Sequence, residues 1–463
     1  MIRLFRVYVP VGTLALLISE IVLLAAAFGV ATYLALVGDP DIFLFYEGGW
    51  IRIAIVILSI LTGLYFHDLY TDLFVKSKLE LLQQLCLIIG GAFLLQGFIS
   101  YLDVDLRVPI RVMVLGNFLC VIGIFCWRIF FTRYALRVVN RDVLLLVGGS
   151  PLLEDIGDYL QRHPESGQVV AGYVDDGHRA AADLSSGKFL GPLSALEEIA
   201  TAVSPNRIVV GMSERRNRVP VNTLLQLRFA GHIIEEAAAV YERVCGRVCL
   251  KELRPSQLIY SGELGPRRNT LIYQTALSRV IAGVGILISL PFMLLTALAV
   301  RLSSPGPVLY RQVRVGLNGE LFTLYKFRSM RVNAEAATGA VWASKDDPRV
   351  TRVGRVIRKI RFDELPQFFN VFVGEMSLVG PRPERPEFVK EFSEHIPYYR
   401  QRHCVRPGIT GWAQINYKYG DTLEDTLCKL EYDLYYIKNK SLSLDTYIIF
   451  HTVKAMLLSR GSQ

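Results

Sequence analysis

The hydrophobic pattern opens with four long apolar stretches, at about residues 9–37, 51–67, 81–101 and 109–131. Each is close to the roughly 20 residues that a membrane-spanning helix needs. The first stretch follows two arginines, as in a signal peptide, but it is too long for the apolar core of one. The pattern therefore predicts a four-helix transmembrane domain over residues 1–135, whose first helix is a permanent anchor.

The charges around these stretches are unevenly distributed. The loop 38–50 contains Asp39, Asp41 and Glu47 but no Lys or Arg. At the ends of the apolar stretches away from this loop, the basic residues are Arg3, Arg6, Lys76, Lys78, Arg133, Arg137 and Arg141. Arg107 and Arg111 do not follow this distribution of charge. Because cytoplasmic loops carry the excess of Lys and Arg, the pattern predicts that the N-terminus and everything after residue 131 face the cytoplasm.

From about residue 142 the pattern changes to that of a soluble α/β domain. The apolar run 143–147 precedes Gly148-Gly149-Ser150, and a second run, 207–210, precedes Gly211, as is typical of buried parallel strands. We predict a Rossmann-like domain over 142–262. Glu154 stands where a dinucleotide fingerprint would have its third glycine, so we expect a scaffold or regulatory domain without bound dinucleotide. The polar, turn-rich residues 262–270 predict a linker.

A fifth apolar stretch, from Val280 to Val300, is long enough to span the bilayer. Both of its flanks are basic, with Arg267, Arg268 and Arg279 before it and Arg301, Arg311 and Arg314 after it. Two basic ends favour two cytoplasmic ends. Pro291 kinks a helix near its middle, and Ser289 could satisfy a carbonyl that the proline frees. We predict a re-entrant membrane helix at about 276–301, with an ordinary proline-kinked crossing as the alternative.

The segment that follows is strongly basic, with 13 Lys or Arg against 4 Asp or Glu between residues 301 and 361. Four apolar residues recur at helical spacing opposite four basic ones: Val353, Val356, Ile357 and Ile360 against Arg352, Arg355, Arg358 and Lys359. This pattern predicts a helix lying in an anionic membrane interface. A solvated helix packed on its own domain is the alternative.

Composition agrees with a membrane protein, since 52% of the 463 residues are hydrophobic and only 20% are charged. A net charge of +9 suits anionic lipids or anionic small substrates. The chain has no zinc-finger spacing, RNA-binding aromatic motif or basic heptad region, so we expect no nucleic-acid partner. Its seven cysteines are scattered without a C-x-x-C pair, which indicates thiols in a reducing compartment.

The candidate chemistry begins at Asp363-Glu364-Leu365-Pro366. Proline is tolerated only in the first turn of a helix, so the two carboxylates are expected at or just before a helix start. One of them could attack a phosphorus atom while the other holds a divalent metal. An N-cap with a solvated neighbour is the alternative for an isolated pair. Nearby cations favour the chemical interpretation, because Lys326 and Arg328 alternate along a predicted strand and Arg382 lies between two prolines.

At this point the final third of the chain resembles a known family. The motifs lie at residues 326–330, 363–371, 376–383 and 406–414, in that order and within about 90 residues. They are similar to those of monotopic phosphoglycosyl transferases, also called bacterial sugar transferases or polyprenyl-phosphate hexose-1-phosphate transferases. The four-helix start and the α/β middle domain further resemble the large, exopolysaccharide-initiating branch.

The resemblance implies a reaction and a set of roles. Asp363 would attack the β-phosphate of a UDP-sugar and expel UMP, and the covalent sugar phosphate would pass to undecaprenyl phosphate by a ping-pong mechanism. Glu364, together with Asp363, is associated with Mg²⁺, and Arg382 with the substrate phosphate. The resemblance also implies a bacterial inner-membrane location. We assign substrate binding to Lys326, Arg328, Arg361, Arg382, Arg406, Gln414 and Asp433, and a break in the membrane helix to Ser289 and Pro291.

The resemblance is incomplete at that break. Family members have a Ser-Pro pair there, whereas Leu290 precedes Pro291 in this chain and Ser289 is displaced by one residue. The aromatic-rich segment 431–439 also looks typical of the family, and we assign it mainly to packing near the site. Homodimerisation is expected only by analogy with the larger members.

The predicted fold is thus a membrane protein of mixed class, with a transmembrane bundle, a Rossmann-like domain and a mainly helical catalytic domain over residues 270–463. One rival is a membrane-anchored sugar-nucleotide dehydratase, for which Tyr436 and Lys440 have the right spacing but no glycine-rich loop in the same domain. A non-catalytic membrane scaffold is another. A transporter has little support, because the apolar stretches carry few charges and Glu20 is expected to face the bundle. The sequence does not name the sugar.

Overall fold

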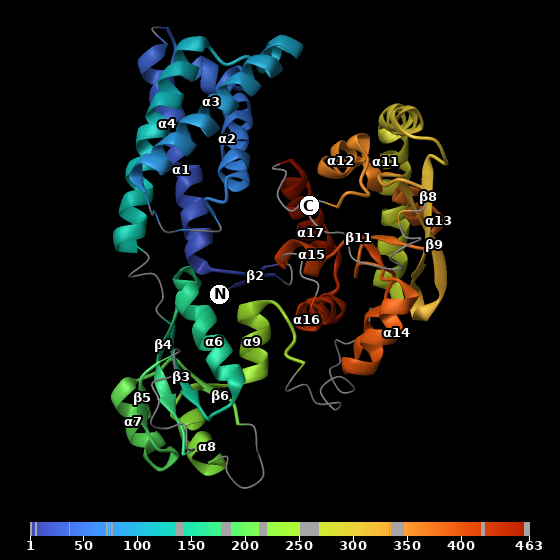
Figure 1. Cartoon of the computed structure of the whole chain (residues 1–463). Helices are drawn as coiled ribbons and strands as arrows, with labels where there is room; N and C mark the ends of the chain where they lie inside the picture. The colour runs from blue at the N-terminus through green and yellow to red at the C-terminus, as the bar shows by residue number, and fades with distance from the viewer. Residues whose placement is uncertain are drawn as a thin grey trace. The chain divides into compact units, whose positions relative to one another are not determined.

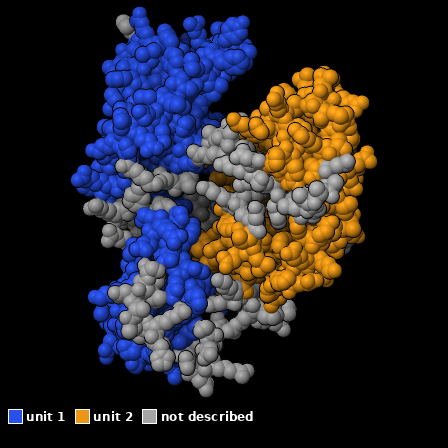
Figure 2. Space-filling model, in the orientation of Figure 1, with its two compact units in different colours: residues 1–4, 8–237 blue, residues 5–7, 238–463 orange. Residues whose placement is uncertain are grey.

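The structure is a computed structural model of the full chain, and it describes residues 2–4, 7–36, 38–70, 73, 75, 77–135, 142–176, 187–212, 220–250, 268–332, 334, 347–417 and 422–457. The chain divides into two compact units, formed by residues 1–4 with 8–237 and by residues 5–7 with 238–463 (Figure 2). Most of the expected linker 262–270 lies outside the described residues. So do five of the basic residues used for orientation, namely Arg6, Lys76, Arg137, Arg141 and Arg267.

The first unit begins with the four predicted apolar helices, which follow two short strands, β1 (Ile2–Leu4) and β2 (Val7–Val9). The helices are α1 (Val11–Ala35), α2 (Gly49–Phe66), α3 (Lys78–Leu102) and α4 (Ile110–Phe130), and they pack side by side (Figure 1). Gly116 lets α4 approach α1 closely, because a Cβ there would lie 2.5 Å from the Phe28 ring. The four predicted helices are thus present, and all are long and apolar enough to cross a membrane, which indicates an integral membrane protein.

A buried ion pair joins two helices of this bundle. The Nε atom of Arg128 lies 2.7 Å from Oε1 of Glu20, and both side chains are almost completely buried. The Tyr70 hydroxyl donates to Oε2 of Glu20 at 2.5 Å, and Arg128 donates to the Leu69 carbonyl at 2.7 Å. Glu20 therefore faces the bundle as expected, and its charge is compensated inside an apolar environment.

The rest of the first unit is a parallel α/β domain, which confirms the predicted class. Its strands are β3 (Asp142–Val147), β4 (Gln168–Val174), β5 (Phe189–Gly191), β6 (Arg207–Val210) and β7 (Ile233–Glu236), paired in the order β5-β4-β3-β6-β7. Its helices are α6 (Pro151–Arg162), α7 (Leu196–Val203) and α8 (Val221–Phe229). Gly148 has a φ of +109°, and a Cβ there would lie 2.2 Å from the Gly211 carbonyl oxygen. The glycines after β3 and β6 thus allow two turns to pack against each other.

The second unit is mainly helical, as predicted. Its helices are α9 (Ala237–Cys245), α11 (Arg268–Ser303), α12 (Arg352–Lys359), α13 (Gln367–Val373), α14 (Pro386–His395), α15 (Trp412–Asn416), α16 (Leu423–Asn439) and α17 (Leu442–Leu457). The first residue of α9, Ala237, still belongs to the first unit. Strands β8 (Leu309–Val315) and β9 (Leu321–Phe327) form an antiparallel hairpin, and β10 (Ser377–Val379) pairs in parallel with β11 (Gly408–Thr410).

Residues 238–250 pack on α16 within this second unit. The indole N–H of Trp412 donates to the Gly246 carbonyl at 2.7 Å, and the backbone N–H of Leu250 donates to Oε1 of Glu431 at 3.1 Å. The aromatic segment 431–439 is largely buried here, so its expected packing role is confirmed.

Helix α11 is one continuous helix of 36 residues with Pro291 inside it. On one side of Pro291, Ala282 packs in a cluster with Val371 of α13; on the other, Met293 packs with Ile357 of α12. Both halves of α11 are therefore held by the same unit. Its opposite face carries many exposed apolar side chains, among them Ile272, Val280, Val284, Leu287, Ile288, Leu294, Leu295 and Leu298.

The expected role of Ser289 is wrong in this structure. Pro291 has no N–H, so the carbonyl left without its helical donor is that of Leu287. Ser289 instead donates its hydroxyl to the Gly285 carbonyl at 2.6 Å, one turn earlier. A serine two positions before the proline reaches a different carbonyl from the one that the proline frees.

Candidate active site

Asp363 and Glu364 lie in one tight turn between two helices. Helix α12 ends at Lys359. Two residues later Arg361, a non-glycine residue, has a left-handed φ of +58°, and a single 3₁₀ turn over Phe362–Glu364 follows it. Pro366 then caps the start of α13. The two carboxylates thus come just before a helix start, as the proline predicts. The left-handed residue costs free energy and is tolerated because packing on both sides fixes the turn.

Three basic side chains surround Glu364. Its Oε1 atom lies 2.8 Å from Nζ of Lys326 and 3.0 Å from an NH2 group of Arg382, and its Oε2 atom lies 3.8 Å from NH1 of Arg361. These cations come from β9, from the turn before Asp363 and from the loop after β10. Glu364 therefore draws three separate segments of the chain to one point beside Asp363.

The two carboxylates have opposite pKa shifts. Burial alone would raise the pKa of Glu364, but Lys326 and Arg382 outweigh it and hold that pKa well below its usual range. Burial, and then repulsion by ionised Glu364, raise the pKa of Asp363 from 3.8 to about 6, although Lys326, Arg358 and Arg382 moderate the rise. Asp363 therefore carries the more basic carboxylate of the two.

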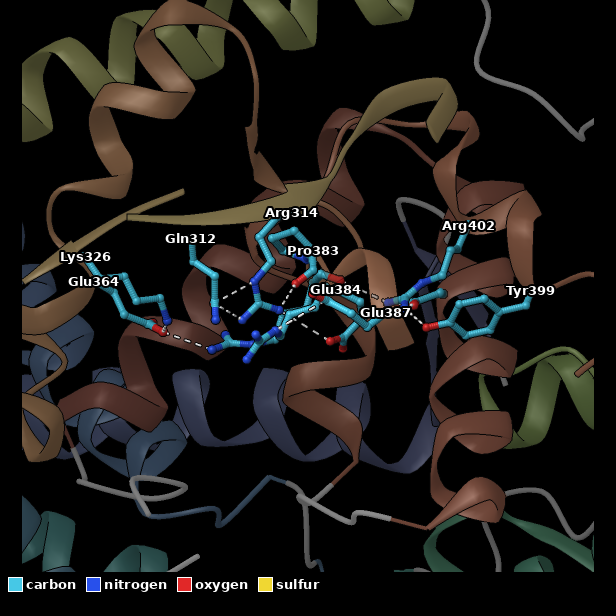
Figure 3. A network of polar contacts seen from close by, with 12 residues as sticks. Gln312, Arg314, Lys326, Glu364, Pro383, Glu384, Glu387, Tyr399 and Arg402 are labelled. Atoms are coloured by element: carbon cyan, nitrogen blue, oxygen red, sulfur yellow. Dashed lines mark hydrogen bonds and ion pairs between the residues drawn. The ribbon is translucent and has the colours of Figure 1, made fainter. Parts of the chain in front are cut away.

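Two arginine side chains hold the loop that carries Arg382, by hydrogen bonds to backbone carbonyl groups of the loop. Arg402 donates to the Arg382 carbonyl at 3.1 Å, and Arg314 donates to the Pro383 carbonyl at 2.8 Å. Figure 3 shows the polar contacts running from Lys326 past Arg314 to Arg402. The backbone at Arg382 is therefore fixed, and this limits the positions that its guanidinium group can occupy.

A buried ion pair fixes Arg402 in turn. One of its nitrogens lies 2.8 Å from Oδ2 of Asp433, another donates to the Tyr399 hydroxyl at 2.6 Å, and both charged side chains are less than a tenth exposed. Burial raises the pKa of Asp433 to about 6, although Arg402 favours its charged form. Asp433, which lies on α16, thus acts on the site through Arg402 and the loop of Arg382.

Comparisons with known proteins match the part of the chain that contains this site. Residues 269–459 match the family model for bacterial sugar transferases. The chain is 36% identical, over 345 residues, to a UDP-glucose:undecaprenyl-phosphate glucose-1-phosphate transferase of Xanthomonas campestris pv. campestris, a match covering 70% of this chain and 68% of that relative. This chain belongs to the bacterial sugar transferase family.

Two other relatives of this bacterial sugar transferase are informative. A UDP-N-acetylgalactosamine-undecaprenyl-phosphate N-acetylgalactosaminephosphotransferase of Aeromonas hydrophila is 47% identical over 224 residues, which cover 48% of this chain and 52% of the relative. An exopolysaccharide production protein of Rhizobium leguminosarum bv. phaseoli is 42% identical over 181 residues, which cover 38% of this chain and 90% of the relative. The chain thus matches about half the length of the Aeromonas relative and most of the Rhizobium relative.

Two predicted site residues of this sugar transferase have other contacts. Arg328 donates to the carbonyls of Ser304 and Pro305 at 2.7 and 2.8 Å, and so closes the C-terminal end of α11. Arg406 donates to the Thr275 hydroxyl at 2.9 Å. Neither contacts the carboxylate pair in the described part of the chain, and their roles in substrate binding stay predictions.

Among the described residues, neither Gln414 nor Asp433 forms a hydrogen bond or an ion pair with Glu364. Gln414 is half-buried at the start of α15, and its Oε1 atom has no hydrogen-bond partner among the described residues. The sequence reasoning missed Arg314 and Arg402. Arg314 alternates with Gln312 along β8, so strand periodicity could have found it, whereas no local pattern marks Arg402.

We expect Asp433→Asn to lower kcat/KM for the sugar donor by roughly tenfold to a hundredfold, because a loosened Arg402 no longer fixes Arg382. The measurement is steady-state turnover at several donor concentrations. Glu424→Gln, an exposed carboxylate on the same helix, is the matched control and should leave kcat/KM unchanged. Equal values for Asp433→Asn and the wild type would contradict the positioning role.

The raised pKa of Asp363 also predicts a pH-dependent stability. Its native pKa, about 6, exceeds the usual 3.8, so the native state favours the protonated form. The resulting destabilisation is absent below pH 3.8 and complete above about pH 6. Asp363→Asn should therefore melt at a higher temperature than the wild type at pH 7.5, with a smaller difference at pH 5. A difference that is the same at both pH values would show that the pKa is not raised.

Proposed function

We propose that this protein transfers a hexose 1-phosphate from a UDP-sugar to undecaprenyl phosphate, releases UMP, and so initiates the assembly of an exopolysaccharide or related glycan. The observation that carries the proposal is the pair of adjacent, largely buried carboxylates, of which Glu364 contacts three cations and Asp363 has a raised pKa. The printed activities of the Xanthomonas and Aeromonas relatives support the same reaction class.

The reaction has two displacement steps at phosphorus. In the first, a carboxylate oxygen of Asp363 attacks the β-phosphorus of the UDP-sugar; the bond from this phosphorus to the bridging oxygen breaks, and UMP leaves with the electron pair. In the second, a phosphate oxygen of undecaprenyl phosphate attacks the same phosphorus and restores the Asp363 carboxylate. A covalent intermediate lets a water-soluble donor and an embedded acceptor use one site in turn.

The cations around Glu364 serve both steps. Lys326, Arg361 and Arg382 lie where phosphoryl oxygens approaching Asp363 would gain negative charge, and preorganised donors stabilise such charge most effectively in a water-poor site. Arg382 can also bind two phosphate oxygens at once with its planar guanidinium.

Whether Mg²⁺ fits this site depends on the side chains that could act as its ligands. Within the described residues no group of three or more His, Cys, Asp or Glu side chains could hold a metal ion. Asp363 and Glu364 would be its protein ligands, with phosphate oxygens and water completing the shell, a set that matches the ordinary preference of Mg²⁺. When bound, the ion would neutralise charge on the diphosphate. Mg²⁺ thus remains part of the proposal.

The contacts of α11 support a re-entrant placement rather than a crossing. Near its start, Gln274 donates to Asp445 of α17 at 2.8 Å, and at its end Ser304 accepts from Arg328. These positions are roughly 45 Å apart along an α-helix, more than the roughly 30 Å of hydrocarbon in a bilayer. A crossing helix would place its ends on opposite sides, whereas both ends of α11 contact one unit. We therefore place this unit on the cytoplasmic side, in accord with the positive charges.

The rival functions fare less well. The Tyr436 hydroxyl is completely buried and donates to Asp445 at 2.8 Å, and Lys440 is also buried. This environment suits packing rather than the open site that a dehydratase needs. A non-catalytic scaffold gives no reason for a buried carboxylate with a raised pKa next to gathered cations. Binding of anionic lipids and homodimerisation stay predictions.

The proposal is tested by UMP release from UDP-glucose, UDP-galactose and their two N-acetylated counterparts, with and without undecaprenyl phosphate. We expect one or two sugars to give sustained, lipid-dependent release, and Asp363→Asn to give none. Glu320→Gln, which neutralises an exposed carboxylate, is the control and should match the wild type. Normal turnover by Asp363→Asn would exclude Asp363 as the nucleophile, and no release with any donor would exclude the function.

The membrane placement is tested by labelling single cysteines in an otherwise cysteine-free chain with an impermeant reagent. Tyr273→Cys and Ser303→Cys mark the two exposed ends of α11, and Glu47→Cys marks the acidic loop. In intact spheroplasts only Glu47→Cys should react, whereas in inverted vesicles both ends of α11 should react. Labelling of either α11 end from outside would contradict the re-entrant placement.

A further inference from the structure

An apolar groove lies between α11 and α12. Its volume is about 500 Å³, within the usual range for small-molecule sites. Its apolar lining includes Leu295, Ala299, Val353, Val356, Ile357 and Phe362. Its walls are almost wholly hydrocarbon, with Thr296 and Arg352 as the polar members of the lining. Such a groove suits an aliphatic chain better than a sugar or a nucleotide.

The groove opens where the unit exposes its apolar surface. Leu295 on α11 is 65% exposed, and Val356 and Ile360 on α12 are 59% and 44% exposed. Ile357, on the neighbouring face of α12, is buried against α11. One apolar edge of α12 thus packs on its own unit, and another is exposed. The free edge, flanked by arginines, is what a helix in an anionic interface presents.

The inner end of the groove reaches the nucleophile turn. Phe362 lines the groove and is the residue immediately before Asp363. Its ring makes an edge contact with Phe292 of α11, with centroids 5.9 Å apart. Arg358, from the same helix that forms one wall, lies close enough to favour the charged form of Asp363. A hydrocarbon channel and a cationic phosphate site therefore meet at one residue.

We propose that this groove holds the isoprene units nearest to the phosphate of the lipid acceptor. The inference rests on the proposed function and extends it by assigning the acceptor a place. A polyprenyl phosphate has the matching polarity, because its anionic head would lie among Arg358, Lys326 and Arg382 while its chain runs outward past Phe362. The donor, which has no aliphatic chain, does not need the groove.

The experiment fills the groove and follows the two half-reactions separately. Ala299→Phe adds a ring to the groove wall, and Ala276→Phe adds the same bulk to an exposed position of α11 outside the groove. Formation of the covalent adduct from UDP-sugar is measured without acceptor, and the KM for undecaprenyl phosphate is measured in mixed micelles. We expect Ala299→Phe to raise this KM about tenfold and to leave adduct formation within twofold of the wild type. Ala276→Phe should change neither.

Other outcomes would overturn the assignment. An unchanged KM would show that the groove serves bulk lipid or nothing. An equal loss of adduct formation and acceptor use would show that Ala299→Phe distorts the nucleophile turn; the milder Ala299→Leu must then raise the KM alone, or the proposal is wrong. Failure of the proposed function itself would look different, since the wild type would then form no adduct.

Discussion

The structure of the site depends on one largely buried carboxylate, that of Glu364. Its two oxygens hold Lys326, Arg361 and Arg382, which come from three parts of the chain. Without that negative charge, three cations would repel one another in a poorly solvated place. Burial, and then the charge of ionised Glu364, raise the pKa of its neighbour Asp363, and the same cations lie beside both carboxylates. The gathering of cations beside Asp363 and part of its raised pKa thus share one electrostatic cause.

A second constraint is the need to bring a soluble and an embedded substrate to the same atom. Helix α11 meets it by packing on its own unit along its length while leaving its opposite face apolar. The turn at Phe362 and Asp363 places a hydrophobic and an ionised residue side by side, at the end of a helix that is itself half apolar and half cationic. Asp363 therefore lies at the boundary between the polar part of the unit and its exposed apolar surface.

Local patterns were sufficient for much of this picture. The length of the apolar stretches predicted α1 to α4, the apolar runs predicted β3 and β6, and Pro366 placed the carboxylate pair before a helix. Contacts between distant residues were beyond these patterns. Nothing near Arg402 shows that it bridges Asp433 and the Arg382 carbonyl, and nothing near Arg328 shows that it closes α11. Ser289 failed for a geometric reason, since a shift of one residue along a helix points a hydroxyl at another carbonyl.

The central claim is that Asp363 becomes covalently linked to a sugar phosphate, and intact-mass measurement tests it most directly. The wild-type protein would be incubated with its UDP-sugar in the absence of acceptor, then weighed and mapped by peptide fragmentation. The account predicts one added hexose phosphate, located on Asp363 and removed when undecaprenyl phosphate is supplied. An adduct on any other residue, or lipid-dependent UMP release in a protein that never gains mass, would contradict it.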